Sequence, residues 1–254
     1  MASGEDIFAV MQACILLSWY FYSEGRWVEI WVFAGFQTRT AIPLRLNYPG
    51  TFARHSIGSP GAYLAPPKDA LDLELRRRTW WMAVLFDRIV SVGGWVHGID
   101  ERDIGTELPL RTQDFETNVR KQIPTSRRTL TWSCFQQNIE DNPQSLFTPD
   151  VFTIHPEEYT DSFLLLIKAM MLFGKVTDFS VRTNLRASAP LSRIQNPFAT
   201  PGFEELDRLV STDFIASFPP RFKNGLSELE SMYGGGGLDT DLYLVHLIPH
   251  AYVT

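Results

Sequence analysis

The sequence predicts an all-α protein, an irregular bundle of helices joined by long loops. Three observations support this fold class. Apolar residues recur at helical spacing in several long segments, proline and glycine gather between those segments, and no segment alternates apolar and polar residues over a useful strand length. Hydrophobic residues make up 44% of the 254 residues and aromatic residues 13%, which is ample for a core and argues against wholesale disorder.

The first expected helix, residues 4–23, contains the longest apolar run of the chain. Ser3 and Asp6 look like a capping box that opens a buried helix. The run is short for a membrane span, contains Gln12 and Ser18, and follows acidic residues where a signal peptide needs basic ones. We therefore expect a core helix of a soluble protein and no membrane contact.

The second and third helices are delimited by glycine and proline. The second, residues 26–42, begins after Gly25 and ends at Pro43, and residues 44–67 are rich in proline and glycine, as loops are. The third, residues 69–93, stops at a glycine pair. Its predicted apolar stripe consists of Leu71, Leu75, Met82, Leu85, Ile89 and Val92.

The second half of the chain is predicted to alternate long loops with three more helices. Residues 95–155 are interpreted as mostly loop, and the polar, aperiodic residues 120–144 within them as a possible mobile insertion. The further helices are expected at 157–184, 202–217 and 238–253. The first of them is apolar on several sides, so it is expected at the centre of the bundle, and Gly234–Gly237 is expected to be a hinge.

The third helix carries unusual charge for a segment with so much aromatic bulk. Glu74 lies one turn before Arg78, the favoured order for an intrahelical ion pair. The run Arg76–Arg78 is interpreted as a solvated helix face. The adjacent Trp80 and Trp81 point about 100° apart and are expected to pack against two neighbouring helices.

Asp87 and Arg88 near the end of this helix have two interpretations. They form an exposed pair of little energetic value, or Asp87 accepts hydrogen bonds from the following loop and fixes it against the bundle. The family resemblance described below favours the second interpretation.

No motif for catalysis, cofactor binding or metal binding stands out. His246 and His250 have helical i, i+4 spacing, but Leu247, Ile248 and Pro249 between them supply no carboxylate, so helix packing is preferred to a zinc site. His155 precedes a proline and is expected to mark a helix start. The sequence contains no phosphate-binding loop or nucleophile elbow. Terpene synthases need an Asp-rich motif, whereas Asp161, Asp178 and Asp207 stand singly.

The spacing Glu-x-x-Arg-Arg-x-Trp-Trp, followed by Asp-Arg, resembles the middle regulatory region of fungal binuclear zinc-cluster transcription factors, often called the fungal-specific or xylanolytic-activator-type domain. Residues 6–42, Ile99 to Pro109, Tyr159 to Lys168 and Asp241 to His250 also look like family sequence and occur in the expected order. The motif residues that match are Glu74, Arg77, Arg78, Trp80, Trp81, Asp87 and Arg88.

The resemblance implies that residues 1–254 form one regulatory domain of a nuclear transcription factor, incomplete at both ends. Family members are thought to use this domain to restrain or license activation, sometimes through a small-molecule effector or a protein co-regulator. Because the apolar first and last helices lack anything to cover them, the isolated chain is expected to expose an apolar patch or to self-associate.

The family's DNA reader is a six-cysteine zinc cluster, but this chain has only Cys14 and Cys134 and no Cys-x-x-Cys pair. Its formal charge of −6 also repels phosphate. Zinc and DNA binding are therefore expected of an N-terminal segment absent here, and no cofactor is expected in this chain. Two alternatives stay open: a stand-alone helical protein that binds a small apolar ligand, and a metal-independent enzyme, which we do not favour.

Overall fold

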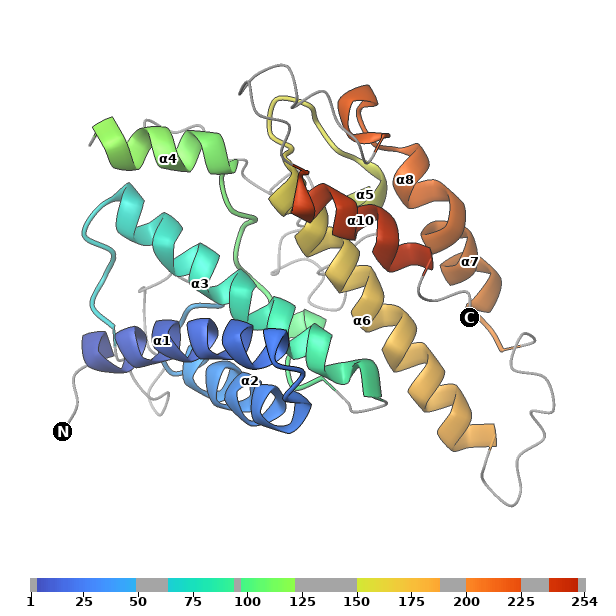
Figure 1. Ribbon diagram of the computed structural model, residues 1–254, viewed down its shortest axis with the longest axis horizontal. Coiled ribbons are helices and arrows are strands. Elements are labelled where there is room, and N and C mark those ends of the chain that lie inside the picture. The colour runs from blue at the N-terminus through green and yellow to red at the C-terminus, as the bar shows by residue number, and fades with distance from the viewer. Residues whose placement is uncertain are drawn as a thin grey trace. The chain divides into compact units, whose positions relative to one another are not determined.

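The computed structural model describes residues 4–48, 64–93, 97–121, 150–187, 200–224 and 238–250, and its regular structure is helical, as the sequence predicts (Figure 1). None of these residues forms a strand. The chain divides into two compact units. The first contains Met1–Val90 and His97–Phe147, and the second contains Ser91–Val96 and Thr148–Thr254.

Three helices form the frame of the first unit. Helices α1 (Gly4–Ser23) and α2 (Trp27–Ala41) form a hairpin that α3 (Ala70–Ile89) packs against (Figure 1). The hairpin turns at Gly25, whose φ of 67° is left-handed and therefore favours glycine. The N–H of Arg26 donates to the carbonyl of Phe21 at 2.9 Å, which satisfies one of the free carbonyls at the end of α1.

The core of this unit is apolar where the three helices meet. Ile15 of α1, Ile30 and Ala34 of α2 and Phe86 of α3 form one buried cluster. A polar contact crosses the hairpin beside it, because the amide of Gln37 donates to the Ser18 hydroxyl at 2.8 Å.

Helix α1 contributes to the core with one face only, and its other apolar face is exposed. Its buried side chains, which lie at helical spacing, are Phe8, Met11, Cys14, Ile15 and Ser18. Leu16 on the opposite face is 71% exposed. Among the described helices, α1 alone is long and apolar enough to cross a bilayer by length and composition, a criterion that core helices of soluble proteins also meet.

Helix α3 differs from the sequence prediction in which face it buries. Its start agrees, because the carboxylate of Asp69 caps it by accepting from the N–H of Asp72 at 2.8 Å. Of the predicted apolar stripe, however, Leu75 is 40% exposed and only Leu85 is fully buried among the side chains that the structure describes. The neighbouring charged residues are buried instead. Several of them pair with groups of the loop that follows α3.

A further helix, α4 (Thr112–Lys121), lies where the sequence predicted loop. Phe115 on α4 packs under the guanidinium of Arg78 on α3, with the ring centroid 4.2 Å from the guanidinium carbon. This long-range contact is not visible in the local pattern. The expected insertion at 120–144 begins within α4, and its residues after Lys121 lie outside the described part of the chain.

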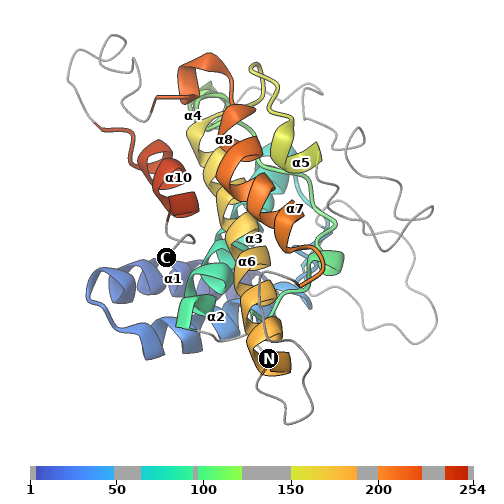
Figure 2. The same cartoon turned by 90° about the vertical axis from the view of Figure 1, so that its right-hand side faces the viewer.

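The second unit is built around α6 (Ser162–Ala187), which α10 (Thr240–His250) packs against (Figure 2). Residues 164–172 of α6 are all buried, as predicted for a central helix. Two aspartates cap these helices: Asp161 accepts from the N–H of Leu164 at 2.9 Å, and Asp239 accepts from the N–H of Leu242 at 3.0 Å.

Shorter elements complete this unit. The segment expected as one helix at 202–217 is interrupted by a π-helical turn, and the expected hinge Gly234–Gly237 lies outside the described residues. The shorter helices are α5 (Asp150–Thr153), α7 (Phe203–Arg208), η5 (Leu209–Asp213), α8 (Phe214–Ala216) and η6 (Pro220–Phe222).

Trp80 should be the more critical of two tryptophans in the first unit. Trp80 is 0% exposed, whereas Trp27 is 47% exposed. We expect Trp80→Ala to lower the free energy of unfolding by about 3–5 kcal/mol because it leaves a cavity in the core. Chemical denaturation should show a much smaller loss for Trp27→Ala. Equal losses in the two variants would contradict a structural role of Trp80.

Candidate functional site

The most distinctive arrangement in the described residues is a row of polar side chains along α3 that holds the following loop, residues 97–110. We call this row the α3 clamp. It extends over about four helical turns. Its members are Glu74, Arg77, Arg78, Trp81, Asp87 and Arg88.

The C-terminal end of the α3 clamp grips the beginning of the loop. Asp87 accepts hydrogen bonds from the N–H groups of Gly98 at 2.8 Å and Ile99 at 3.0 Å. Arg88 donates to Asp87 at 2.6 Å and to the carbonyl of Ile99 at 3.0 Å. The contacts agree with the interpretation in which Asp87 fixes the loop.

The approach of the loop at this point leaves little room. A Cβ atom added to Gly98 would lie 3.3 Å from Oδ1 of Asp87 and 3.5 Å from Oγ1 of Thr38. Asp87 is 4% exposed and Arg88 is 0% exposed, so this pair is buried. The interpretation of Asp87 and Arg88 as an exposed pair is therefore wrong.

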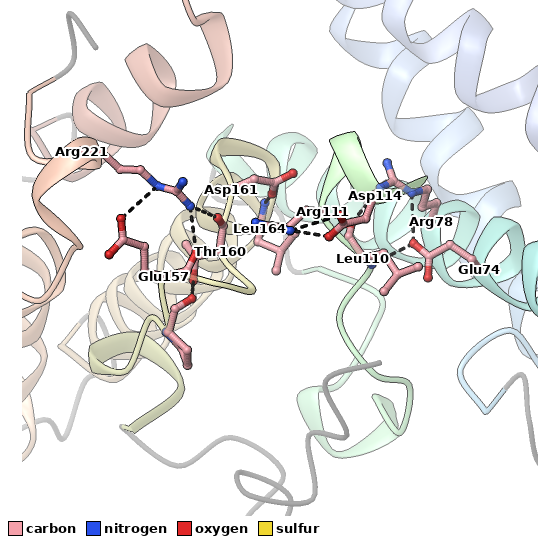
Figure 3. A network of polar contacts seen from close by, with 11 residues as sticks. Glu74, Arg78, Leu110, Arg111, Asp114, Glu157, Thr160, Asp161, Leu164 and Arg221 are labelled. Atoms are coloured by element: carbon pink, nitrogen blue, oxygen red, sulfur yellow. Dashed lines mark hydrogen bonds and ion pairs between the residues drawn. The ribbon is translucent and has the colours of Figure 1, made fainter. Parts of the chain in front are cut away.

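The N-terminal half of the α3 clamp holds the end of the loop (Figure 3). One carboxylate oxygen of Glu74 accepts from Nε of Arg78 at 3.1 Å and from the N–H of Leu110 at 2.9 Å. Arg78 in turn donates to the carbonyl of Leu110 at 2.7 Å. Both backbone polar groups of Leu110 are thus satisfied by one intrahelical ion pair, the pair that the i, i+4 spacing predicted.

The middle of the α3 clamp engages Glu107. The guanidinium of Arg77 pairs with the Glu107 carboxylate, and the indole N–H of Trp81 donates to the Glu107 carbonyl at 2.8 Å. The packing predicted for Trp81 is therefore accompanied by a hydrogen bond that the sequence did not indicate. Trp80, the adjacent residue, is fully buried.

Burial dominates the electrostatics of Glu74. The side chain is almost completely buried, and this desolvation raises the pKa of its carboxyl, although Arg78, the N–H of Leu110 and Arg77 each act to lower that pKa. The ion pairs of Glu74 thus offset only part of the desolvation cost. Removing one partner of such a pair leaves a buried charge uncompensated, which is more damaging than losing an exposed pair.

The interpretation of Arg76–Arg78 as a solvated face is wrong. Arg76 is 2% exposed and Arg77 is 8% exposed. Arg76 forms a two-pronged pair with Asp72, at 3.1 and 2.9 Å, and donates to the carbonyl of Ala65 at 2.7 Å. Burial of these arginines is compensated by carboxylates for Arg76 and Arg77 and by the Ala65 carbonyl for Arg76, which accept from several of their donors.

A second polar pair, missed by the sequence analysis, lies within the second unit. Nζ of Lys168 on α6 contacts the carbonyl of Ile154 at 3.0 Å and Nδ1 of His155 at 3.1 Å, while Nε2 of His155 lies 3.0 Å from the carbonyl of Phe152. The imidazole therefore accepts from Lys168 and donates to Phe152. His155 lies between α5 and α6 and does not begin a helix, so that expectation was wrong.

Burial determines the charge state of this pair. Desolvation lowers the pKa of Lys168 to about 7. Desolvation, together with the charge of Lys168, lowers the pKa of His155 to about 3, although the hydrogen bond to Phe152 acts in the opposite direction. The sequence around Lys168 did not indicate its buried contacts, because its acceptor at Ile154 is a backbone carbonyl.

The two histidines at i, i+4 spacing on α10 contact the protein backbone or solvent. Nε2 of His246 lies 2.8 Å from the carbonyl of Phe222, and His250 is exposed. Within the described part of the chain, no group of three or more His, Cys, Asp or Glu side chains could hold a metal ion.

Neutralising Asp87 should loosen the loop. Asp87→Asn removes the charge that compensates Arg88, so we expect a loss of about 3–5 kcal/mol in the free energy of unfolding. Hydrogen exchange at the Gly98 and Ile99 amides should accelerate. Asp114→Asn, which changes a partly exposed pair with Arg111, should cost only about 0.2–1 kcal/mol. Unchanged exchange at both amides would contradict the clamp.

Stability should depend on pH through Lys168 and His155. Both have a lower pKa when folded than their ordinary values of 10.5 and 6.5, so the unfolded chain binds more protons. The contribution of Lys168 to the free energy of unfolding is complete above pH 10.5 and is lost as the pH falls toward 7. The contribution of His155 is complete above pH 6.5 and is lost as the pH falls toward 3.

Urea denaturation between pH 7 and 9 should therefore show stability rising with pH, and Lys168→Met should flatten that rise. Lys175→Met, on the same helix but partly exposed, is the matched control and should leave the rise unchanged. A rise of equal slope in the Lys168→Met variant would contradict the pKa shift.

Comparison with known proteins identifies the family. Residues 3–173 match the family described as the fungal specific transcription factor domain. The negative regulator of pleiotropic drug resistance STB5 of Candida glabrata is 35% identical over 113 residues, which are 44% of this chain and 10% of that protein. An uncharacterized transcriptional regulatory protein of Schizosaccharomyces pombe is 30% identical over 122 residues, 48% of this chain and 12% of that protein.

A further relative, the citrinin biosynthesis transcriptional activator mrl3 of Monascus ruber, is 30% identical over 108 residues, 42% of this chain and 20% of that protein. The matched segments thus span a fifth or less of the length of these relatives. No solved structure matches the chain.

The names of the family and of these relatives indicate transcription regulators rather than enzymes. The α3 clamp and the loop that it holds lie entirely inside the matched residues 3–173. The chain belongs to the family of fungal specific transcription factor domains.

Proposed function

We propose that this chain is the regulatory region of a longer zinc-cluster transcription factor that acts in the nucleus. The observation that carries the proposal is the family match over residues 3–173, which includes the complete α3 clamp. The motif residues Glu74, Arg77, Arg78, Asp87 and Arg88 engage the backbone or side chains of one loop.

The chemistry of the α3 clamp suits a two-state element. A partly opened clamp leaves a buried carboxylate or guanidinium unpaired, which is costly. Residues 97–110 are therefore either fully seated on α3 or released. A small-molecule effector or a co-regulator that binds one of these states better than the other shifts the population between them.

The proposal assigns DNA and zinc binding to another segment of the full-length factor. The two cysteines of this chain are too few for a six-cysteine cluster, and the formal charge of −6 disfavours contact with phosphate. The alternative, a stand-alone protein for a small apolar ligand, gains no support from a particular contact among the described residues.

The α3 clamp should control activation rather than promoter binding. In the full-length factor we expect Asp87→Asn to change reporter output per promoter-bound molecule while chromatin immunoprecipitation shows unchanged occupancy, because loop release alters the regulatory region alone. Asp213→Asn is the matched control, since it removes a carboxylate from a more exposed pair with Arg208. Asp213→Asn should leave output per bound molecule unchanged.

Two results would contradict the proposal. One is reporter output that stays unchanged in Asp87→Asn although hydrogen exchange shows the loop released. The other is stoichiometric zinc or sequence-specific DNA binding by the purified 254-residue chain, measured by elemental analysis and by a mobility-shift titration. The first result would show that the α3 clamp does not regulate activation. The second would show that zinc or DNA binding belongs to this chain.

A further inference from the structure

The outward face of α2 is apolar and uncovered. Val28 is 63% exposed, Val32 is 55% exposed and Trp31 is 47% exposed, although each lies on a helix whose opposite face is completely buried at Ile30 and Ala34. Residues spaced three and four apart share a helix face, and this face continues to the C-terminal end of α2. We call it the α2 stripe, formed by Val28, Trp31, Val32, Gly35, Phe36 and Arg39.

The α2 stripe has a notch between its large side chains. A Cβ atom added to Gly35 would meet nothing within 4 Å, so the space above this glycine is open. Val32 and Phe36 flank it, and Phe36 is 41% exposed. A notch beside projecting apolar side chains allows a second helix to approach closely.

We propose that the α2 stripe is a homodimer interface in which α2 of each copy packs antiparallel to α2 of the other. A two-fold axis through the midpoint between positions 32 and 35 makes the surface self-complementary, as an isologous contact requires. Val32 of one copy then fills the Gly35 notch of the other, and Trp31 faces Phe36.

Charge selects the antiparallel orientation. Arg39 is the one charged member of the α2 stripe, and it forms no ion pair among the described residues. The same two-fold axis brings Arg39 of one copy opposite Val28 of the other and next to Glu29, a partly exposed carboxylate that also pairs with Arg26 of its own chain. A parallel arrangement would set the two Arg39 side chains against each other, which like-charge repulsion disfavours.

The size of the α2 stripe predicts a weak dimer. Aromatic side chains bury roughly 150–250 Å² each, so the exposed parts of Trp31 and Phe36 supply roughly 130–220 Å². The valines, the glycine backbone and the stem of Arg39 bring the total to a few hundred Å². Stable interfaces need about 800 Å² per partner, so the dimer should dissociate on dilution.

Sedimentation of the purified 254-residue chain over a dilution series tests the proposal. We expect a reversible monomer–dimer equilibrium that Val32→Glu and Gly35→Leu both shift to monomer. Gly35→Leu is the sharper variant, because it fills the notch at a position where an added Cβ atom meets nothing within 4 Å. Leu16→Glu places a charge on the exposed face of α1 instead and should leave dimerisation unchanged.

Cysteine cross-linking tests the orientation. In chains carrying Cys134→Ser, a mixture of the Val28→Cys and Arg39→Cys variants should form a mixed disulfide dimer. Val28→Cys alone should not, because antiparallel packing separates the two copies of position 28 by about three helical turns.

Three results would overturn the proposal. They are a chain that stays monomeric at all concentrations, dimerisation that Leu16→Glu abolishes and Val32→Glu does not, and efficient cross-linking of Val28→Cys to itself. Two further results would also overturn the homodimer. One is binding of the chain to lipid vesicles through the α2 stripe, and the other is growth into larger oligomers that Gly35→Leu does not reduce.

Discussion

The first unit depends on the mutual satisfaction of buried charge and loop backbone. Asp87 and Glu74 are buried carboxylates that the protein can hold only with donors around them. The loop supplies N–H groups at Gly98, Ile99 and Leu110, and these groups in turn need acceptors. Neither the helix nor the loop can be buried in this way without the other. This reciprocity explains why the motif contains acidic, basic and aromatic residues together on one helix.

The second unit solves a similar problem with less charge. Lys168 lies in the centre of an apolar helix, and its neighbours are a carbonyl oxygen and a neutral imidazole. With no carboxylate among these two contacts to hold its proton, burial lowers the pKa of the amine instead. The α3 clamp pairs carboxylates with guanidinium groups, whereas Lys168 contacts a carbonyl and an imidazole, and burial lowers the pKa of both Lys168 and His155. The two units should therefore respond differently to pH.

The surface of the first unit complements this buried network. The charges of α3 are turned inward, while much of the apolar surface of α1 and α2 is turned outward. In the proposed function, the contact between α3 and its loop would act as a two-state switch, and the exposed apolar face would be a surface for association. Dimerisation through the α2 stripe would not require the α3 clamp to open, so the two can be tested separately with Gly35→Leu and Asp87→Asn.

The sequence by itself determined the all-α class, the hairpin break at Gly25, the start of α3 at Asp69 and the Glu74–Arg78 pair. These features depend on local spacing and local capping, which the order of residues specifies directly. The family motif added the loop contact of Asp87. Only the tertiary structure decided that Arg76 and Arg77 are buried, that Leu75 is exposed and that Lys168 meets His155. The partners that decide this include the carbonyl of Ala65 for Arg76 and the carbonyl of Ile154 for Lys168. Every residue carries a backbone carbonyl, so the sequence does not indicate which carbonyl will accept a given hydrogen bond. Only the folded chain brings that carbonyl to the side chain that donates to it.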